Sequence, residues 1–341
     1  MKAFVLAAGE GTRLRPLTLA LPKPMVPIAN TPLLVRTLRL LAAQNIRDVA
    51  VNLFHRPEAI LQSLGEGAEI GVRLRYSHEE TLMGTAGGAK RLQAFLDETF
   101  LVLYGDNLYH ADFAPLLAFH HATGATATIA TFTAPNPSAC GLLLSDTDGR
   151  VTRFQEKPPP EEVFTDQANA GVYVLEPEVL RRYVPEGAPF DFGKDVFPAL
   201  LADKPGSVFA RPLNGYLQDT GTIPAYRQAN WDILRGVAGP KESGLAPSAQ
   251  IAADARLEGD NIIGAHCAIA QGAAVADSIL WQSCRIEAGA SVTGAILGER
   301  VHIGRGAFVG PDAILANDVI VTPGTRVPSG ARVGPGEHIA A

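Results

Sequence analysis

Two hydrophobic patterns follow one another along this chain of 341 residues. Up to residue 235, apolar runs typical of buried strands alternate with segments of helical periodicity. Residues 3–8, 48–53 and 100–106 form such runs, and the apolar spacing in residues 31–43 predicts an amphipathic helix. This alternation predicts an α/β domain with a mostly parallel sheet, at whose carboxyl edge ligands bind.

A six-residue hydrophobic repeat begins after residue 245 and continues almost to the end of the chain. Its apolar positions are Ile251, Leu257, Ile263, Ile269, Val275, Leu280, Ile286, Val292, Leu297, Ile303, Val309, Leu315, Val321, Val327 and Val333. The spacing shortens by one residue at two points, and small residues fill most of the positions between. A repeat this long predicts a parallel β-helix of hexapeptides, in which each coil stacks on its neighbours.

A short segment of linker composition separates the two patterns. Residues 236–245 read Gly-Val-Ala-Gly-Pro-Lys-Glu-Ser-Gly-Leu. The sequence therefore predicts one domain over residues 1–235, a linker over 236–245 and a β-helix over 246–341. The chain is long enough for each domain to bury a core of its own.

The first apolar run ends in a loop suited to binding phosphate. The loop holds Gly9, Gly11 and Thr12, and arginines follow at positions 13 and 15. Glycines let backbone N–H groups approach an anion closely, and arginine donors match phosphate oxygens. Further on, Lys23 stands between two prolines. The loop has neither the Gly-Lys-Ser/Thr ending of a Walker motif nor the third small residue of a dinucleotide fingerprint, so it predicts another kind of triphosphate site.

The composition describes a soluble globular protein without a basic surface. Hydrophobic residues make up 47% and charged residues 19%, and the net charge is −6. No field of this sign recruits nucleic acid, so we expect none as a partner. Cys140, Cys267 and Cys284 lie far apart and predict neither a disulfide framework nor a zinc site. The sequence shows no secretion leader and no long apolar span, so we expect a cytoplasmic protein with no membrane partner.

Two aspartates stand where a strand or a turn ends. Asp106 lies in Gly105-Asp106-Asn107 after an apolar run, and Asp219 opens an Asp-Thr-Gly-Thr sequence. Carboxylates are the ligands that Mg²⁺ shares with substrate phosphates. An Asx turn at Asp106 and a helix cap near Asp219 are the structural alternatives, and the residues alone leave them open.

The glycine loop also carries a family resemblance. Residues Gly9 to Thr18, together with Pro22-Lys23-Pro24, resemble the opening signature of the sugar-1-phosphate nucleotidylyltransferases, also called NDP-sugar pyrophosphorylases. Ala8 departs from the glycine of many members. The resemblance implies a Rossmann-like nucleotidyltransferase domain over residues 1–235. With the hexapeptide proteins, it implies a left-handed β-helix with three repeats per coil.

The resemblance implies Mg²⁺-dependent transfer of a nucleotidyl group from a nucleoside triphosphate to a sugar 1-phosphate. The residues carried over as catalytic are Arg13, Lys23, Asp106, Lys157 and Asp219. Of these, Asp106 and Asp219 are the implied Mg²⁺ ligands. The implied contacts to the sugar phosphate are Asn107, Glu156, Lys157, Asn169 and Gly171.

A second glycine-rich segment, residues 80–88, resembles the part of the family that holds the base. The implied nucleotide contacts are Leu6, Ala8, Gly9, Gly11, Thr12, Arg13, Glu80, Gly84, Thr85 and Ala86. The sequence Leu-Met-Gly-Thr-Ala-Gly is similar to that of mannose-1-phosphate guanylyltransferases, and a carboxylate at Glu79 or Glu80 could pair with the guanine N–H edge. A helix start capped by Gly84 and Thr85 is the structural alternative.

We therefore expect a GTP-dependent enzyme that acts on mannose 1-phosphate. Three alternatives remain at this point. The first is another substrate pair, glucose 1-phosphate with UTP or dTTP. The second is a non-catalytic regulatory paralogue that binds a nucleotide-sugar. A bifunctional enzyme whose β-helix transfers an acyl group through His266 or His302 is the third. The default role of the β-helix is assembly, so we expect a homo-oligomer.

Overall fold

The computed structural model describes residues 1–340 and divides into two compact units. The first unit comprises Met1–Gly9 and Leu34–Leu217, and the second comprises Glu10–Leu33 and the chain from Gln218 onward. The segment that carries Arg13 and Lys23 therefore belongs to the same unit as the C-terminal part of the chain.

The first unit is built on a mixed sheet whose centre is parallel. Its strands are β1 (Lys2–Leu6), β4 (Asp48–Leu53), β5 (Arg73–His78), β6 (Phe100–Tyr104), β8 (Ala127–Thr133), β9 (Gly141–Ser145), β10 (Val151–Glu156), β11 (Gln167–Leu175) and β12 (Val208–Pro212). They follow the order β10-β9-β11-β6-β1-β4-β5, and β8 joins β11 to β12. Strands β6, β1, β4 and β5 run parallel, whereas β11 is antiparallel to β6.

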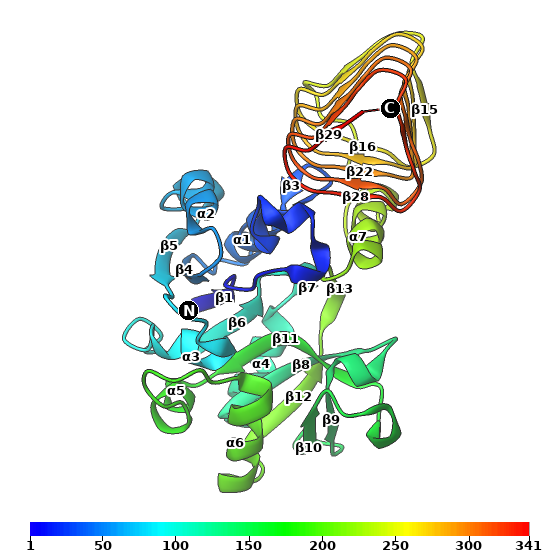
Figure 1. Cartoon of the computed structure of the whole chain (residues 1–341). Coiled ribbons are helices and arrows are strands. Elements are labelled where there is room, and N and C mark those ends of the chain that lie inside the picture. The colour runs from blue at the N-terminus through cyan, green and yellow to red at the C-terminus, as the bar shows by residue number, and fades with distance from the viewer. Residues whose placement is uncertain (341) are drawn as a thin grey trace. The chain divides into compact units, whose positions relative to one another are not determined.

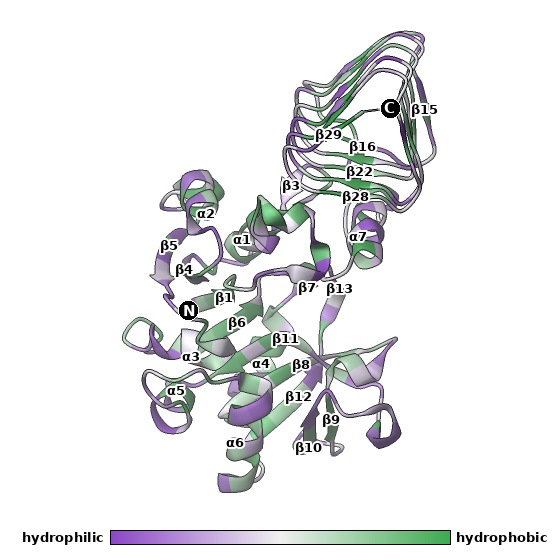
Figure 2. Ribbon diagram, in the orientation of Figure 1, coloured by the Kyte–Doolittle hydropathy of each residue, from purple (hydrophilic) through white to green (hydrophobic). Residues whose placement is uncertain are grey.

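Helices lie beside this sheet, as Figure 1 shows. They are α1 (Leu33–Ala43), α2 (Pro57–Leu64), α3 (Gly84–Lys90), α4 (Ala114–Thr123), α5 (Pro177–Tyr183) and α6 (Phe197–Asp203). Consecutive residues Ala3, Phe4 and Val5 of β1 are all fully buried. Because successive side chains of a strand point to opposite faces, this burial requires cover on both faces of the sheet. The central strands are largely green in the hydropathy colouring of Figure 2. The predicted Rossmann-like α/β fold is confirmed.

The predicted helix over residues 31–43 begins two residues late. Thr31–Pro32 forms a short strand, β3, which pairs with β2 (Pro27–Ile28), and α1 starts at Leu33. Proline disfavours a helical backbone at the residue before it, so Thr31 stays extended. A further two-stranded sheet joins β7 (Asn107–Asp112) to β13 (Asn214–Asp219).

The second unit contains the β-helix, which Figure 1 shows as a stack of three-sided coils. Three parallel sheets of short strands form its sides. The first is β14 (Gln250–Ile251), β17 (Ala268–Ile269), β20 (Arg285–Ile286), β23 (His302–Ile303), β26 (Ile320–Val321) and β29 (His338–Ile339). The second is β15 (Arg256–Glu258), β18 (Ala274–Ala276), β21 (Ser291–Thr293), β24 (Phe308–Val309) and β27 (Arg326–Val327). The third is β16 (Ile262–Ile263), β19 (Ile279–Leu280), β22 (Ile296–Leu297), β25 (Ile314–Leu315) and β28 (Arg332–Val333).

Every apolar position of the predicted six-residue repeat lies in one of these strands. Ile263 pairs with Leu280, whereas Ile251 pairs with Ile269 and Leu297 with Leu315, so the coils that contain the one-residue slips are one residue shorter than those before and after them. From Ile263 onward the repeat side chains are buried in one continuous core. Each coil thus covers the apolar interior of the next, and the predicted parallel β-helix is confirmed.

One outer face of the β-helix is also buried. The outward-facing residues of the third sheet, Ile262, Ile279, Ile296 and Ile314, are at most 2% exposed. Helix α7 (Ile223–Arg235) lies beside this face, where Arg227 donates to the carboxylate of Asp312 at 2.7 Å and to the carbonyl of Gly294 at 2.8 Å. The Thr222 hydroxyl caps the start of α7, and Gly236 ends it with a left-handed backbone.

None of the helices within residues 1–340 is both long and apolar enough to cross a membrane.

Candidate functional site

In the second unit, a buried lysine faces an exposed carboxylate. The Lys23 side chain is only 5% exposed, and its Nζ lies 3.6 Å from Oδ1 of Asp219, whose side chain is 58% exposed. Pro22, directly before Lys23, has an extended backbone, and a short 3₁₀ helix, Lys23–Met25, follows. Burial of a charged lysine requires a partner, and Asp219 supplies a negative one.

Arg13 lies beside the same carboxylate because residue 221 is a glycine. A Cβ on Gly221 would stand 2.5 Å from Nη2 of Arg13 and 2.9 Å from Oδ1 of Asp219. The N–H of Gly221 also donates to that oxygen at 2.7 Å. Arg13, Lys23 and Asp219, which the sequence places far apart, therefore share one neighbourhood of the second unit.

The turn at Gly11 brings the two cationic segments into contact. Gly11 has φ of +64°, and a Cβ there would lie 2.8 Å from the Cβ of Lys23. The Thr18 hydroxyl donates to the Gly11 carbonyl at 2.7 Å, and Thr12 opens a 3₁₀ turn that carries Arg13. Arg13 and Lys23 supply two basic groups, and Asp219 supplies one carboxylate. This excess of basic groups suits this part of the molecule to an anion.

In the first unit, the start of the glycine loop lies beside Asp106. Leu6 of β1 pairs with Tyr104 of β6, and the Gly105 N–H donates to the Leu6 carbonyl at 2.8 Å. Both strands are parallel and end here, so Ala8 and Gly9 leave the same carboxyl edge as the half-buried Asp106. The ligand edge that the α/β pattern predicts is thus occupied by these predicted site residues.

The predicted base segment is held in place by the segment that follows Pro189. Ala86 N–H donates to the Phe190 carbonyl at 2.9 Å, and a Cβ on Gly84 would stand 2.5 Å from that oxygen. The Thr85 hydroxyl donates to Asp191 at 2.8 Å and accepts from the Phe192 N–H at 2.8 Å. Thr85 therefore anchors its own segment, and Glu80 is exposed at the other end of it.

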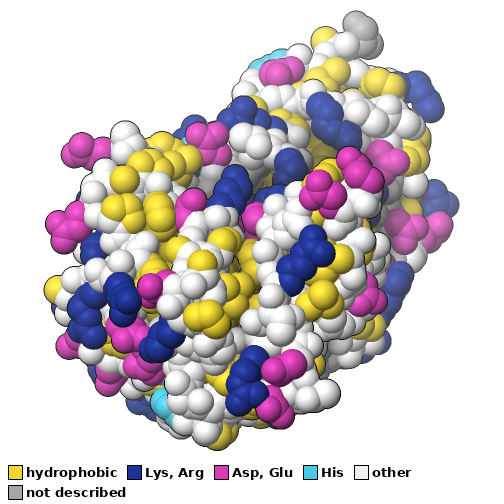
Figure 3. Space-filling view, turned by 90° about the horizontal axis from the view of Figure 1, so that it is seen from below, with side chains coloured by type: hydrophobic (Ala, Val, Ile, Leu, Met, Phe, Trp, Pro, Cys, Tyr) yellow, Lys and Arg dark blue, Asp and Glu magenta, His cyan; other side chains and the backbone are white. Residues whose placement is uncertain are grey.

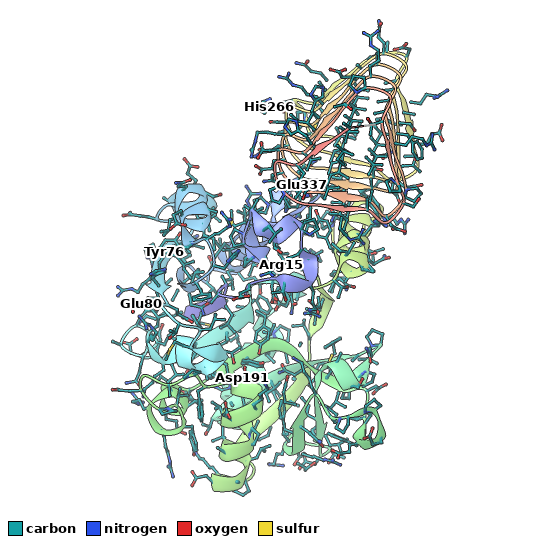
Figure 4. All side chains as sticks on the ribbon, viewed as in Figure 1. Arg15, Tyr76, Glu80, Asp191, His266 and Glu337 are labelled. Atoms are coloured by element: carbon teal, nitrogen blue, oxygen red, sulfur yellow. The ribbon has the colours of Figure 1, made fainter. Side chains whose placement is uncertain are left out.

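Asp191 is a residue that the sequence reasoning missed. Its other oxygen, Oδ1, accepts from Gly193 N–H at 2.9 Å and Lys194 N–H at 3.1 Å, so it caps the next helical turn. Figure 4 labels it together with Glu80 among the side chains of the first unit. An aspartate two residues before a glycine is an ordinary capping signal, but its partner Thr85 is 106 residues away and gives no local sign of the pairing.

The predicted sugar-phosphate residues Glu156 and Lys157 form a close charge pair. Lys157 Nζ lies 3.7 Å from Glu156 Oε1, with the lysine side chain 62% exposed and the glutamate 17% exposed. Burial raises the pKa of Glu156, while Lys157 opposes this shift and Asp191 adds to it. The arrangement offers an exposed cation for a phosphate and a shielded acceptor for hydroxyl groups.

Two glycines make room for the Glu156 carboxylate. A Cβ on either Gly141 or Gly193 would collide with Oε2 of Glu156. Gly141 pairs with Glu156 across β9 and β10, and Gly193 belongs to the turn capped by Asp191. The base segment and Glu156 are therefore both in contact with residues 190–193.

Asn169 and Gly171 form a bulge in β11. The Asn169 amide donates to the Tyr173 hydroxyl at 2.8 Å and its oxygen accepts from the Gly171 N–H at 2.8 Å. Gly171 has φ of +68°, which favours glycine, and the register of β11 against β8 shifts here. Asn107, also predicted to hold the sugar phosphate, is buried and donates to the Tyr109 hydroxyl at 3.2 Å.

The two predicted metal ligands offer carboxylate oxygen, which suits Mg²⁺. Asp106 belongs to the first unit, and Asp219 belongs to the second. Within residues 1–340, no group of three or more His, Cys, Asp or Glu side chains could hold a metal ion by itself. Each aspartate by itself offers the oxygen ligand that Mg²⁺ combines with waters and substrate phosphates.

Charges of both signs are intermixed on the face shown in Figure 3. Lys and Arg side chains stand among Asp and Glu side chains there. This distribution agrees with the net charge of −6. The pair of basic side chains at Arg13 and Lys23 is therefore a local feature.

Comparisons with known proteins agree with this fold. The Nucleotidyl transferase family model matches residues 2–236, and a model described as the GMPPB C-terminal domain matches residues 241–340. A solved structure of a Bacillus anthracis protein assigned as a glucose-1-phosphate thymidylyltransferase superposes with a TM-score of 0.61 at 23% identity. It covers 68% of this chain and 94% of that one, and it supports the fold alone.

Curated relatives are similar at the level of sequence. A UTP–glucose-1-phosphate uridylyltransferase of Synechocystis is 38% identical over 70% of this chain. A mannose-1-phosphate guanylyltransferase of Mycobacterium tuberculosis is 38% identical over 69% of it, and a mannose-1-phosphate guanyltransferase of Schizosaccharomyces pombe is 35% identical over 78%. The matches span 63%, 65% and 74% of the length of these relatives, respectively. By these matches, the chain belongs to the nucleotidyl transferase family of enzymes.

Proposed function

We propose that this protein transfers a nucleotidyl group from a nucleoside triphosphate to a sugar 1-phosphate and releases pyrophosphate. The observation that carries the proposal is the buried Lys23, 3.6 Å from Asp219 and beside Arg13. This set combines a lysine and an arginine with a carboxylate that can hold a metal, as triphosphate chemistry requires. Membership of the nucleotidyl transferase family supports it.

The reaction is an in-line displacement at the α-phosphorus. A phosphate oxygen of the sugar 1-phosphate attacks, and a new P–O bond forms. The bond between the α-phosphorus and the bridging oxygen of pyrophosphate breaks, and its electron pair leaves with pyrophosphate. Positioning and electrostatic stabilisation account for most of the catalysis in such a transfer, without a covalent enzyme intermediate.

Each proposed residue has a role in that displacement. The amides of the glycine loop and Arg13 hold the triphosphate and stabilise charge on the departing pyrophosphate. Lys23 lies near the α-phosphate, Lys157 binds the phosphate of the sugar, and Glu156 accepts from sugar hydroxyls. The further proposed contacts are Leu6, Ala8, Gly9, Gly11, Thr12, Glu80, Gly84, Thr85 and Ala86 for the nucleotide and Asn107, Asn169 and Gly171 for the sugar phosphate.

Asp106 and Asp219 are the proposed Mg²⁺ ligands. When bound, Mg²⁺ would neutralise phosphate charge and orient both reactants. The large exposed fraction of the Asp219 side chain leaves it accessible to an ion.

The substrate pair we propose is GTP with mannose 1-phosphate. The match of residues 241–340 to the GMPPB C-terminal domain supports it, as do the names of the Mycobacterium and Schizosaccharomyces relatives. The exposed carboxylate of Glu80 supports it further, because a carboxylate can accept from the N–H edge of guanine.

UTP with glucose 1-phosphate is the second candidate. The Synechocystis relative named for that reaction has the same 38% identity to this chain as the Mycobacterium relative. A matrix of nucleoside triphosphates against sugar 1-phosphates, read by pyrophosphate release, tests both candidates. We expect the highest kcat/KM for GTP with mannose 1-phosphate, and a higher value for any other pair would reject that choice.

The domain boundaries and the assembly are also proposals. We assign catalysis to residues 1–235, a linker to 236–245 and assembly to the β-helix over 246–341. The stacked outer faces of the β-helix suit symmetric packing of subunits into a homo-oligomer. Light scattering coupled to gel filtration tests this, and a monomer at micromolar concentration would reject it. A cytoplasmic location stays a prediction.

A further inference from the structure

Asn52 and Glu79 form a buried hydrogen-bonded pair in the first unit, which we name the Asn52–Glu79 clamp. Asn52 is 1% exposed and Glu79 is 2% exposed. The Asn52 Nδ2 donates to Glu79 Oε1 at 2.8 Å. Two backbone groups complete the clamp: Ala7 N–H donates to Asn52 Oδ1 at 2.8 Å, and Met83 N–H donates to Glu79 Oε2 at 2.9 Å.

The direction of every bond in the clamp is fixed by chemistry. A backbone N–H can only donate, so the Asn52 oxygen must face Ala7 and its NH₂ group must face Glu79. Glu79 then receives one donor on each oxygen, which only a carboxylate can accept without conflict. The clamp therefore specifies an amide at position 52 and a carboxylate at position 79.

Helix α3 packs directly on the clamp. A Cβ on Gly88 would stand 2.7 Å from Glu79 Oε1 and 2.9 Å from Asn52 Nδ2. The clamp thus joins the end of β1 at Ala7, the strand β4, the Met83 backbone and helix α3 of the first unit.

The clamp separates the roles of two adjacent glutamates. Both Glu79 oxygens accept from internal donors and the side chain is buried, so this carboxylate is not accessible to a base. Glu80 is exposed instead. The backbone groups that the clamp fixes are next to Ala8 and Gly9 on one side and to Gly84 on the other, which the proposed function assigns to the nucleotide.

We propose that Asn52 and Glu79 are positioning residues that set the spacing between the two backbone segments of the nucleotide site. This inference rests on the proposed function. Neither side chain touches the nucleotide. Each acts through the main chain, so its loss affects binding of the triphosphate and leaves binding of the sugar 1-phosphate unchanged.

An exchange of the polar groups tests the clamp. In Glu79→Gln, the new NH₂ group must face either the Met83 N–H or the Asn52 NH₂, and in Asn52→Asp two carboxylates face each other. In the double variant, the new carboxylate at position 52 accepts from the Ala7 N–H and from the new amide NH₂ at position 79. The amide oxygen at position 79 then accepts from the Met83 N–H. The double variant therefore restores every bond with almost unchanged shape.

We expect each single variant to raise the KM for the triphosphate about tenfold, and the double variant to return it to within about threefold of wild type. The KM for the sugar 1-phosphate should stay within about twofold in all three. Glu69→Gln, which alters an exposed carboxylate outside the clamp and the proposed site, is the matched control. The proposal would be overturned if the KM for the triphosphate were unchanged in both single variants. It would also be overturned if the KM in the double variant rose by as much as the two single effects combined.

Hydrogen exchange separates this inference from the proposed function. Amides of peptides that contain Ala7 and Met83 should exchange faster in each single variant and return to wild-type rates in the double. If the wild-type protein turns over no substrate pair, the proposed function fails, and the exchange rates still decide whether the clamp exists. If a single variant does not fold, the double variant should still fold and show wild-type exchange rates at Ala7 and Met83. A double variant that does not would reject the proposed role of the Asn52–Glu79 clamp.

Discussion

The indole N–H of Trp281 donates a 2.9 Å hydrogen bond to the hydroxyl of Tyr226. The same hydroxyl donates to the carbonyl of Pro27 at 2.8 Å. Trp281 follows β19 of the β-helix, Tyr226 lies on α7, and Pro27 closely follows the segment with Lys23. In the second unit, one buried hydroxyl therefore joins the β-helix to the segment that carries two proposed catalytic cations.

Tyr226→Phe should destabilise the protein by about 2 kcal/mol, because it leaves a buried indole N–H and a carbonyl without this partner. Urea denaturation followed by tryptophan fluorescence measures the change. Tyr183→Phe removes a hydroxyl that bonds the exposed Asp203 carboxylate, and it should change stability by no more than about 0.5 kcal/mol. Equal effects of the two substitutions would contradict the account of Tyr226.

Lys23→Met should lower kcat/KM about 100-fold, the scale expected when one preorganised electrostatic contact is lost. Methionine replaces the apolar stem of the lysine and removes its ammonium group, so the fold should persist. Steady-state kinetics with both substrates measure the effect, and Lys241→Met is the control because Lys241 is exposed. A Lys23→Met enzyme with normal kcat/KM would remove Lys23 from the proposed mechanism.

Asp106→Asn and Asp219→Asn should each raise the Mg²⁺ concentration needed for half-maximal rate and lower the maximal rate about 100-fold. Each substitution removes a negative charge and one hard oxygen ligand. Chelation of divalent ions should stop the wild-type reaction, and added Mg²⁺ should restore it. Activity that persists after chelation would reject the metal requirement.

Glu156→Gln should stabilise the protein at neutral pH while it weakens sugar 1-phosphate binding. Burial raises the pKa of Glu156 above its ordinary value of 4.5, with Lys157 opposing and Asp191 adding. As pH rises, Glu156 therefore loses its proton in the unfolded chain before it does so in the folded protein. The free energy of unfolding falls between the ordinary pKa of this carboxyl and its raised pKa in the folded protein. Above the pKa of Glu156 in the folded protein, the full cost of burying its carboxylate is present. Below the ordinary pKa, Glu156 is protonated in both states and this cost disappears.

Thermal unfolding of the wild type and Glu156→Gln at about pH 4 and about pH 7.5 tests this sign. The variant should have the higher Tm at the upper pH and a smaller advantage at the lower one. Kinetics should show a rise of about tenfold in the KM for sugar 1-phosphate, as expected when an acceptor of substrate hydroxyls becomes an amide. A variant that is less stable at neutral pH would contradict the assignment of burial as the dominant cause.

The β-helix could be predicted from the sequence because its period is local. A coil turns every few residues, so positions such as Ile263 and Leu280 repeat regardless of the rest of the chain. The cover on its third sheet was missed, although the sequence carries a signal for it. In the third sheet, an isoleucine stands directly before the repeat residue on successive coils, as in Ile279-Leu280 and Ile296-Leu297. The other two sheets have no such run of apolar residues at this position. These additional isoleucines are the ones that are buried on the outer face beside α7.

The strand ends around the candidate site were also predictable, since Gly9 and Asp106 each follow a buried strand. The contacts that hold those ends were not. Asn52 lies 45 residues from Ala7, and Asp191 lies 106 residues from Thr85. Neither residue belongs to a motif, and tertiary packing alone gives them their partners. Sequence patterns report periodicity and loops, whereas a buried side chain that bonds a distant backbone leaves no periodic trace.

The central claim is nucleotidyl transfer to a sugar 1-phosphate, and label transfer tests it most directly. The wild-type protein is incubated with Mg²⁺, mannose 1-phosphate and GTP labelled at the α-phosphate, and the products are separated. We predict that the label appears in GDP-mannose in the same molar amount as the pyrophosphate released. The absence of pyrophosphate and of labelled nucleotide-sugar with GTP, UTP, dTTP, ATP and CTP, each offered with mannose or glucose 1-phosphate, would contradict the account.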